Sequence, residues 1–429
     1  MLTAGSRPRA EPFLGHLRAF NRDRLGSLAQ WARDHGDVVE LRFGPKRFVL
    51  LSDPALITEV LVDRAADFRK GYSVRLMRPV LGNGLLLNEG DHWRARRRLI
   101  QPELQRARVR GYAEVISRWT SWQLRQWSPG AVRDVYEDMS LLTMGIATEL
   151  IFGVDARSAH PVASALRGAV REATRGRPLR AFPLARFLPT AANAREALIL
   201  RRLDRAIHAW LRERRANAGG ADVLAALLRA GDADPFQLRD DLVTLFFGAY
   251  DTTSNALAWA LYLVATHPDV SALLAAEASD PSGDAAEGGY AEAIVLEALR
   301  LYPSGWAESR EALRECVIGG HRIGRGDSVV VSQWVTHRDP RWFDDPLLFR
   351  PERWTGGLAD RLPRGAYFPF GLGPRRCVGA SLAMLESTMV LRAVARGWTL
   401  RPAVAAVPVP EAIFTLRPKG GVPISVDAR

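Results

Sequence analysis

Along most of this chain, apolar residues recur every three or four positions, which is the period of an amphipathic helix. The pattern predicts helices at 25–35, 54–63, 92–151, 161–174, 191–216, 237–267 and 290–301. The stretch 237–267 is apolar on nearly all faces, so we expect a helix buried in the centre of the fold. In 70–89, scattered glycines and weak periodicity predict a loop with little regular structure.

Short runs of β-forming residues predict small sheets beside these helices. Strands are expected at 38–43, 47–52, 322–323 and 328–332, and a final hairpin within 411–426. The fold class is therefore mainly α with small β-sheets. No linker or internal repeat divides the chain, so we expect one continuous domain over 1–429, with surface loops at 217–234 and 277–289.

Composition excludes several classes of protein. The two cysteines, Cys316 and Cys377, suggest no disulfide framework and fit a reducing compartment. The net charge of +12 comes almost wholly from scattered arginines, without a lysine-rich tail or interleaved aromatics, so no nucleic-acid partner is expected. A basic surface could still steer an acidic electron-transfer protein. No apolar run reaches the roughly 18–20 residues needed to span a bilayer, so we expect no membrane anchor and a cytoplasmic protein.

The segment 370–379 carries the most specific chemistry. Its sequence, Phe-Gly-Leu-Gly-Pro-Arg-Arg-Cys-Val-Gly, fits F-x-x-G-x-R-x-C-x-G and places Cys377 in a glycine-lined turn ahead of a helix. Glycines let the backbone approach a flat ligand closely, and the start of a helix stabilises a thiolate. A thiolate ligand on haem iron favours cleavage of the O–O bond. A lone cysteine is more often a buried core residue, but the matched positions speak against that interpretation.

The pattern resembles the haem-binding loop of the cytochrome P-450 superfamily, and the resemblance covers nearly the whole chain. It implies haem b held between a long central helix and the cysteine loop, with Cys377 as the axial ligand to iron. In the same loop, it places Phe370, Arg375 and Gly379 at the cofactor. Cys316, within a short strand-like run, is expected to be a small core residue.

A second motif lies in the apolar helix predicted at 237–267. The run Phe-Gly-Ala-Tyr-Asp-Thr-Thr at 247–253 sets an acid beside two threonines, which is costly in an apolar helix without a partner or a task. It resembles the family signature A/G-G-x-D/E-T-T/S, which implies Asp251 as proton relay and Thr252 as the hydroxyl at the bound oxygen. Ala249 replaces the usual second glycine, so we expect a slightly narrower groove.

A third motif, Glu297-Ala-Leu-Arg300, sets opposite charges at i and i+3 of one helix. Such a pair is ordinarily a surface ion pair of small value. The resemblance instead implies the E-x-x-R motif, in which Glu297 and Arg300 turn inward to meet Arg353. A buried triad of this kind is structural, and removing one member should leave unpaired charge and prevent haem uptake.

Haem propionates require forked donors such as arginine. Two pairs on one predicted helix have the spacing of W-x-x-x-R, namely Trp93 with Arg97 and His92 with Arg96. Spacing does not choose between them, but the run that follows at 98–102 resembles the family register that selects Trp93 and Arg97. By the same resemblance, Arg310 and Arg375 are further propionate partners.

The resemblance places the substrate beside the haem, against 71–87, 155–188, 246–249, 304–306 and 413–415. Tyr250, Trp306 and Phe414 are candidate contacts, although each is equally suited to a packed core. The apolar lining favours hydrophobic substrates, and the chain resembles bacterial natural-product oxidases, so a terpenoid is expected, with fatty acids or steroids as alternatives. Electrons are expected from a separate ferredoxin or flavodoxin with its NAD(P)H reductase, because no nucleotide fingerprint or fused reductase follows the cysteine loop.

Three functions remain open at this point. The first is a haem-thiolate monooxygenase that inserts one atom of O₂ into a C–H or C=C bond. A peroxide-driven hydroxylase is the second, and Asp251 with Thr252 speaks against it, since those relatives usually lack the pair. The third is a non-catalytic haem protein that senses or carries a ligand.

Overall fold

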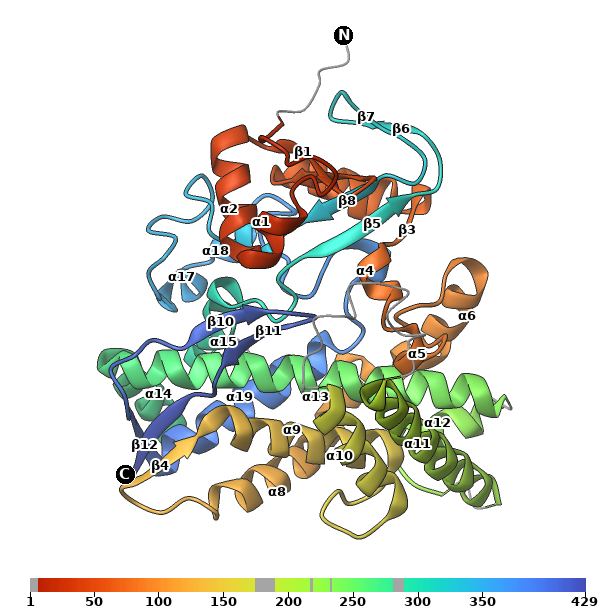
Figure 1. The fold of residues 1–429 in the computed structure, drawn as a ribbon. Helices are drawn as coiled ribbons and strands as arrows, with labels where there is room; N and C mark the ends of the chain where they lie inside the picture. Colours follow the sequence, from red (N-terminus) through yellow and green to blue (C-terminus); the bar gives the residue numbers. More distant parts are fainter. Residues whose placement is uncertain (1–6, 174–189, 217–218, 232–233, 281–288) are drawn as a thin grey trace. The chain divides into compact units, whose positions relative to one another are not determined.

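The computed structural model describes residues 7–173, 190–216, 219–231, 234–280 and 289–429 (Figure 1). These form two compact units, each assembled from separated segments of the chain. The first contains 1–72, 120–140 and 252–429, and the second contains 73–119 and 141–251. Both units are mainly helical, while the paired sheets lie in the first, so the fold is mainly α with small β-sheets.

The first unit holds a five-stranded sheet in the order β1-β2-β8-β5-β3. Its strands are β1 (Val38–Phe43), β2 (Lys46–Leu51), β3 (Phe68–Lys70), β5 (Glu308–Ala312) and β8 (Ser328–Val331). Only the pairing of β2 with β8 is parallel, with Phe48 opposite Ser328. Successive side chains of β2 enter two different cores, because strand residues alternate between faces: Val49 and Leu51 pack in one core and Leu50 in the other.

Smaller sheets complete the strands of this unit. They consist of β4 (Ala131–Asp134), β12 (Pro423–Ala428) and β9 (Trp398–Pro402), of β6 (Cys316–Ile318) with β7 (His321–Ile323), and of β10 (Val409–Ala412) with β11 (Leu416–Lys419). The strand β4 interrupts the helical stretch predicted at 92–151. Its pairing partner, with Ser425 opposite Val132, is about two thirds of the chain length away, so local periodicity could not reveal it.

Helices make up the rest of the first unit. They are α1 (Leu17–Arg22), α2 (Arg24–His35), α3 (Pro54–Thr58), α14 (Pro268–Ser279), α15 (Tyr290–Leu301), α16 (Gln333–Thr336), α17 (Glu352–Thr355), α18 (Leu358–Arg361) and α19 (Ala380–Gly397). The predicted helix at 54–63 changes after α3 to a π-helical turn, Glu59–Asp63. At the start of α2, the side chain of Asp23 accepts a hydrogen bond from Gly26 N at 2.9 Å, a typical N-cap.

The second unit contains α5 (Arg78–Leu81), α6 (Gly90–Ile100), α7 (Arg106–Val109), α10 (Pro161–Ala173), α11 (Ala191–Ala216) and α12 (Val223–Arg229). The short α4 (Tyr72–Arg75) and α5 occupy part of the segment predicted to be an irregular loop. They are single turns, too short to produce a visible period.

Three longer helices run from one unit into the other: α8 (Ala113–Leu124), α9 (Val135–Phe152) and α13 (Pro235–Thr266). As the all-round apolar pattern predicts, side chains on several faces of α13 are fully buried, among them Leu242, Phe246, Leu257 and Trp259. The division between the units falls inside α13, between Asp251 and Thr252. In the described part of the chain, no single helix is long and apolar enough to cross a membrane; the bent pair α13–α14 meets that test only by length and composition.

Candidate active site

Cys377 lies between a turn of 3₁₀ helix, Gly373–Arg375, and the start of α19 at Ala380. Its N–H donates to the carbonyl of Phe370 at 2.8 Å, which closes the loop. Gly371 and Gly373 both have a φ of +70°, and a Cβ on Gly373 would collide with the carbonyl of Leu61. Gly371 and Gly373 are therefore required by backbone conformation and by close approach, and their loop presents an exposed Cys377 thiol just ahead of a helix.

Cys316 has a different environment. It is 5% exposed at the start of β6 and packs in an apolar core with Val331 and Phe368. Burial raises the pKa of its thiol, which disfavours the thiolate. Of the two cysteines, Cys377 is thus the one with the exposure that a metal ligand needs, while Cys316 takes the core role expected of it.

Arg310 lies near the cysteine loop. It is buried on β5 and pairs with Glu308 at 2.9 Å. The other carboxylate oxygen of Glu308 would lie 2.6 Å from a Cβ on Gly371, so Glu308 touches both Arg310 and the loop. Burial opposes ionisation of Glu308, but the charges of Arg310 and Lys70 outweigh it and lower its pKa. A cationic group is therefore held at the edge of the loop, as propionate binding requires.

The structure brings Glu297, Arg300 and Arg353 together, with Glu297 and Arg300 fully buried. Glu297 accepts two hydrogen bonds from Arg300, at 2.8 and 2.9 Å, and one from Arg353 at 3.2 Å. Two further donors complete its shell, the indole N–H of Trp354 at 2.9 Å and the backbone N–H of Arg350 at 3.0 Å. A carboxylate with five donors is well compensated for its loss of water.

A histidine outside the predicted site links this network to the cysteine loop. The carbonyl of His337 accepts from Arg300 at 2.9 Å, and its ring Nε2 accepts from Phe368 N at 2.9 Å, two residues before Phe370. Burial, together with the charges of Arg300 and Arg338, lowers the pKa of His337 well below its usual value, so the ring is neutral and can accept. Neither His337 nor Trp354 is among the predicted site residues, although Trp354 directly follows the predicted Arg353.

In the second unit, α6 carries Arg96 and Arg97, the two arginines between which the W-x-x-x-R spacing alone does not choose. Arg96 is buried and its Nε donates to the buried Asp241 of α13 at 2.6 Å. Burial raises the pKa of Asp241, and Arg96 with Gln237 opposes that rise. Arg97 and Trp93 are half-buried, and Arg97 bonds Gln101 at 2.8 Å. Because Arg96 is committed to an internal pair, the geometry favours the register with Trp93 and Arg97.

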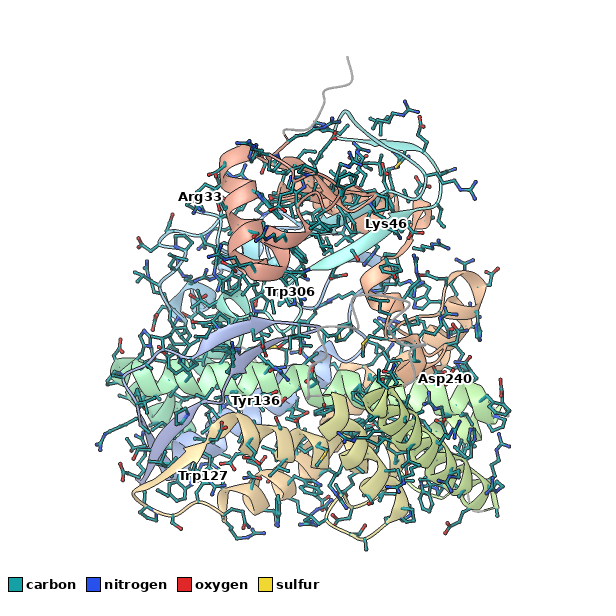
Figure 2. The ribbon with its side chains drawn as sticks, viewed as in Figure 1. Arg33, Lys46, Trp127, Tyr136, Asp240 and Trp306 are labelled. Atoms are coloured by element: carbon teal, nitrogen blue, oxygen red, sulfur yellow. The ribbon has the colours of Figure 1, made fainter. Side chains whose placement is uncertain are left out.

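Asp251 and Thr252 are both half-buried near the middle of α13. The candidate substrate contact Tyr250 is 3% exposed and packs against Phe246, with ring centroids 5.2 Å apart, so the core role describes it better. Trp306, labelled in Figure 2, is buried and its indole N–H donates to the carbonyl of Ile413 at 3.3 Å, while Phe414 is exposed. Part of the predicted lining, 174–188, lies outside the described residues.

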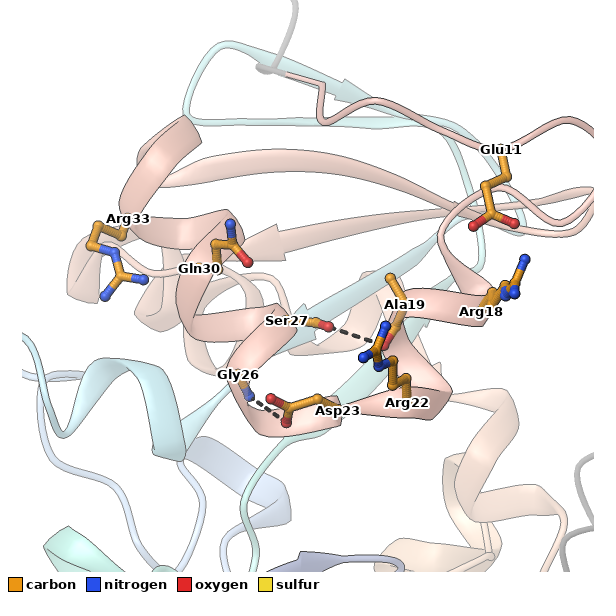
Figure 3. Close-up of a pocket in the computed structure, with 9 residues that line it drawn as sticks. All are labelled: Glu11, Arg18, Ala19, Arg22, Asp23, Gly26, Ser27, Gln30 and Arg33. Atoms are coloured by element: carbon orange, nitrogen blue, oxygen red, sulfur yellow. Dashed lines mark hydrogen bonds between the residues drawn. The ribbon is translucent and has the colours of Figure 1, made fainter.

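A surface hollow of about 560 Å³ lies along α1 and α2, where polar side chains such as Arg18, Arg22 and Asp23 line it (Figure 3). Its residues include none of the predicted site. The exposed arginines are accompanied by Glu11 and Asp23, so the hollow has no consistent charge. It therefore plays no part in the site described above.

Comparison with known proteins decides the family, since the cytochrome P-450 family model matches residues 6–422. The chain belongs to the cytochrome P-450 family. Two relatives come from Streptomyces melanosporofaciens. Cyclooctatin synthase is 34% identical over 92% of this chain and 89% of its own, and cyclooctat-9-en-7-ol 5-monooxygenase is 32% identical over 93% and 90%.

This cytochrome P-450 is therefore a monooxygenase, an enzyme that uses O₂, an organic substrate and electrons from a redox partner. Its cofactor is haem, held by a cysteine thiolate in this family. The residues present fit that group: an exposed thiol ahead of α19, a loop whose glycines permit close approach, and a buried arginine at the loop's edge. Bound haem supplies the activation of O₂.

Proposed function

We propose that this cytochrome P-450 inserts one oxygen atom into a C–H or C=C bond of a terpenoid. In a hydroxylation, substrate, O₂, NAD(P)H and a proton give the alcohol, NAD(P)⁺ and water. Two electrons come from the nicotinamide through a carrier, and the second oxygen atom leaves as water. The exposed thiol of Cys377, set against the buried Cys316, is the observation that supports a haem-thiolate enzyme.

In this proposal Cys377 ligates the haem iron, and Phe370 and Gly379 shape its loop. The propionates are bound by Trp93, Arg97, Arg310 and Arg375. The buried Arg310 beside Glu308 and the half-buried Arg97 support that role, because each presents a forked donor on a rigid strand or helix.

Protons for cleaving the O–O bond would pass through Asp251 and Thr252. A carboxylate followed by a hydroxyl on a buried helix can relay a proton to a fixed atom. The pair also favours electron-driven chemistry over a peroxide-driven hydroxylase, whose chemistry needs no such relay. The Glu297 network would hold the fold around the cofactor, and it contributes no atom to the reaction.

A terpenoid substrate is supported by the names of the relatives, one of which is called after cyclooctat-9-en-7-ol. Fatty acids and steroids are the competing apolar classes. The electron donor would be a ferredoxin or flavodoxin that docks over the Cys377 loop. Exposed Arg376, next to Cys377, and the net charge of +12 would attract an acidic carrier of this kind.

The test is a titration of the haem-loaded enzyme with cyclooctat-9-en-7-ol, palmitic acid and testosterone, followed at the Soret band. We expect the terpenoid to produce the low-to-high-spin shift, and NADPH with a plant-type ferredoxin and its reductase to yield a hydroxylated or epoxidised product. A shift with palmitic acid or testosterone in its place would reassign the substrate class. A bound ligand without NADPH-dependent product would favour a non-catalytic haem protein.

A further inference from the structure

Two hydroxyl groups from outside α13 donate to carbonyls on either side of Asp251. Thr143 of α9 donates from Oγ1 to the carbonyl of Tyr250 at 3.0 Å, within the second unit. Ser304, which follows α15, donates from Oγ to the carbonyl of Thr252 at 2.7 Å, within the first unit. Both side chains are buried, at 1% and 6% exposure.

These bonds add to the normal bonding of the helix. In an α-helix each of the two carbonyls also accepts from the N–H four residues later, here Ser254 and Ala256. A carbonyl oxygen has two lone pairs and accommodates both donors. The extra donor fixes the direction of that carbonyl and therefore the plane of the peptide that follows it. The two peptides held in this way are the ones that flank Asp251 and Thr252.

Ser304 is itself held in place, so its hydroxyl is a fixed reference for α13. Its carbonyl accepts from Leu416 N at 3.0 Å, and the carbonyl of Leu416 accepts from the indole N–H of Trp259 at 3.3 Å. Two residues before Ser304, the ring of Tyr302 stacks on Trp259 at 3.9 Å and 3°. A closed chain of hydrogen bonds therefore runs from Thr252 through Ser304 and Leu416 back to α13 at Trp259, about two turns later.

We propose that Thr143 and Ser304 are positioning residues for the Asp251–Thr252 pair. They hold the two peptides so that the carboxyl and hydroxyl groups stay in line for proton delivery. This rests on the proposed function, in which the pair would relay the protons that cleavage of the O–O bond requires. Without the extra donors the pair becomes less well aligned, and a larger share of the electrons leaves as hydrogen peroxide: NADPH, a proton and O₂ give NADP⁺ and H₂O₂.

Variants of Thr143 allow a matched test. Thr143→Val removes the hydroxyl at nearly constant volume, and Thr143→Ser keeps it. Thr148→Val is the control, because Thr148 is also on α9, is also 1% exposed and donates to the carbonyl of Met144 within its own helix at 2.7 Å. Ser304→Ala tests the second donor.

The measurement is hydrogen peroxide released per NADPH consumed, with a plant-type ferredoxin and its reductase, at equal haem content. The substrate is whichever tested compound gives the largest Soret shift. We expect about two- to tenfold more peroxide for Thr143→Val and Ser304→Ala, the range set by losing one neutral hydrogen bond. Thr143→Ser and Thr148→Val should match the wild type. Equal peroxide in all variants, or an equal rise in Thr148→Val, would overturn the proposal.

Amide exchange of a peptide spanning 250–260 gives a second readout that does not depend on turnover. Removing either outside donor should speed its exchange by about two- to tenfold, because local opening then breaks one bond fewer. Faster exchange without any change in peroxide would reduce Thr143 and Ser304 to structural residues. A wild type that consumes no NADPH would instead refute the proposed function, while the exchange data would still report on the two bonds.

Discussion

Glu386 is a buried acid in α19, the helix that follows the cysteine loop, and its ionisation should make stability depend on pH. It is 2% exposed, and its Oε1 has no hydrogen-bond partner among the described residues. Burial raises the pKa of Glu386 from 4.5 to about 8. The folded protein therefore holds this proton over a pH range in which the unfolded chain releases it.

The sign and size of this pH dependence follow from the difference in bound protons between the unfolded and the folded state. Below pH 4.5 the carboxyl group is protonated in both the folded and the unfolded state, so its ionisation does not lower the free energy of unfolding. As the pH rises to about 8, the unfolded state binds fewer protons than the folded state, so stability falls, and above that range the penalty is constant. At pH 7 the penalty is on the order of 3 kcal/mol, from about 1.4 kcal/mol for each unit between 4.5 and 7.

Glu386→Gln removes the titration and keeps the shape. We expect the stability of the variant relative to wild type to rise by on the order of 3 kcal/mol between about pH 4.5 and 7. Urea unfolding followed by tryptophan fluorescence at several pH values measures this difference. Glu114→Gln, at an exposed position of α8, is the control and should show no such rise. Free energies of unfolding that change with pH in parallel for Glu386→Gln and wild type, between about pH 4.5 and 7, would refute a raised pKa of Glu386 in the folded protein.

Three further predictions concern the Glu297 network, the Arg96–Asp241 pair and Thr252. Glu297→Gln should lower the free energy of unfolding by about 3–5 kcal/mol and reduce haem incorporation, because Arg300 keeps a buried charge without its counter-ion; urea unfolding and haem absorbance measure this. Asp241→Ala should lower the free energy of unfolding by a similar amount, because it leaves the charge of Arg96 buried without its partner. The double variant Arg96→Met/Asp241→Leu should recover most of that free energy. Thr252→Ala should release more hydrogen peroxide per NADPH and less product, measured by peroxide assay.

Each of these three predictions has a result that would contradict it. Full haem content and unchanged stability in Glu297→Gln would mean that the network is replaceable. A double variant no more stable than Asp241→Ala would show that the loss at Asp241 does not come from an uncompensated Arg96. Unaltered coupling in Thr252→Ala would remove that hydroxyl from proton delivery.

Periodicity predicted the elements whose cause is local. The predicted helix 290–301 coincides with α15, because its apolar face and its ends are set by neighbouring residues. The predicted strand 38–43 coincides with β1. The strand β4 and the π-helical turn after α3 escaped prediction, since distant pairing and a local change of helical register leave no mark on the hydrophobic period.

The residues of the site also fall into two groups, those that adjacent residues in the sequence reveal and those that only tertiary contacts reveal. Motifs at 247–253, 297–300 and 370–379 are runs of adjacent residues, so the sequence displays them directly. Thr143 and Ser304 are single hydroxyl residues in unrelated segments, and their bearing on Asp251 comes from tertiary contacts alone. The resemblance at 98–102 already selects Trp93 and Arg97, and the pairing of Arg96 with Asp241, 145 residues away along the chain, adds a physical reason that spacing alone does not give.

The proposed function depends on ligation of the haem iron by the thiolate of Cys377. The measurement is the difference spectrum of the reduced protein with CO minus the reduced protein without CO, taken for wild type, Cys377→Ala and Cys316→Ala. The wild type and Cys316→Ala should give the thiolate-type band, and Cys377→Ala should lose it. A thiolate-type band that persists in Cys377→Ala would contradict the assignment.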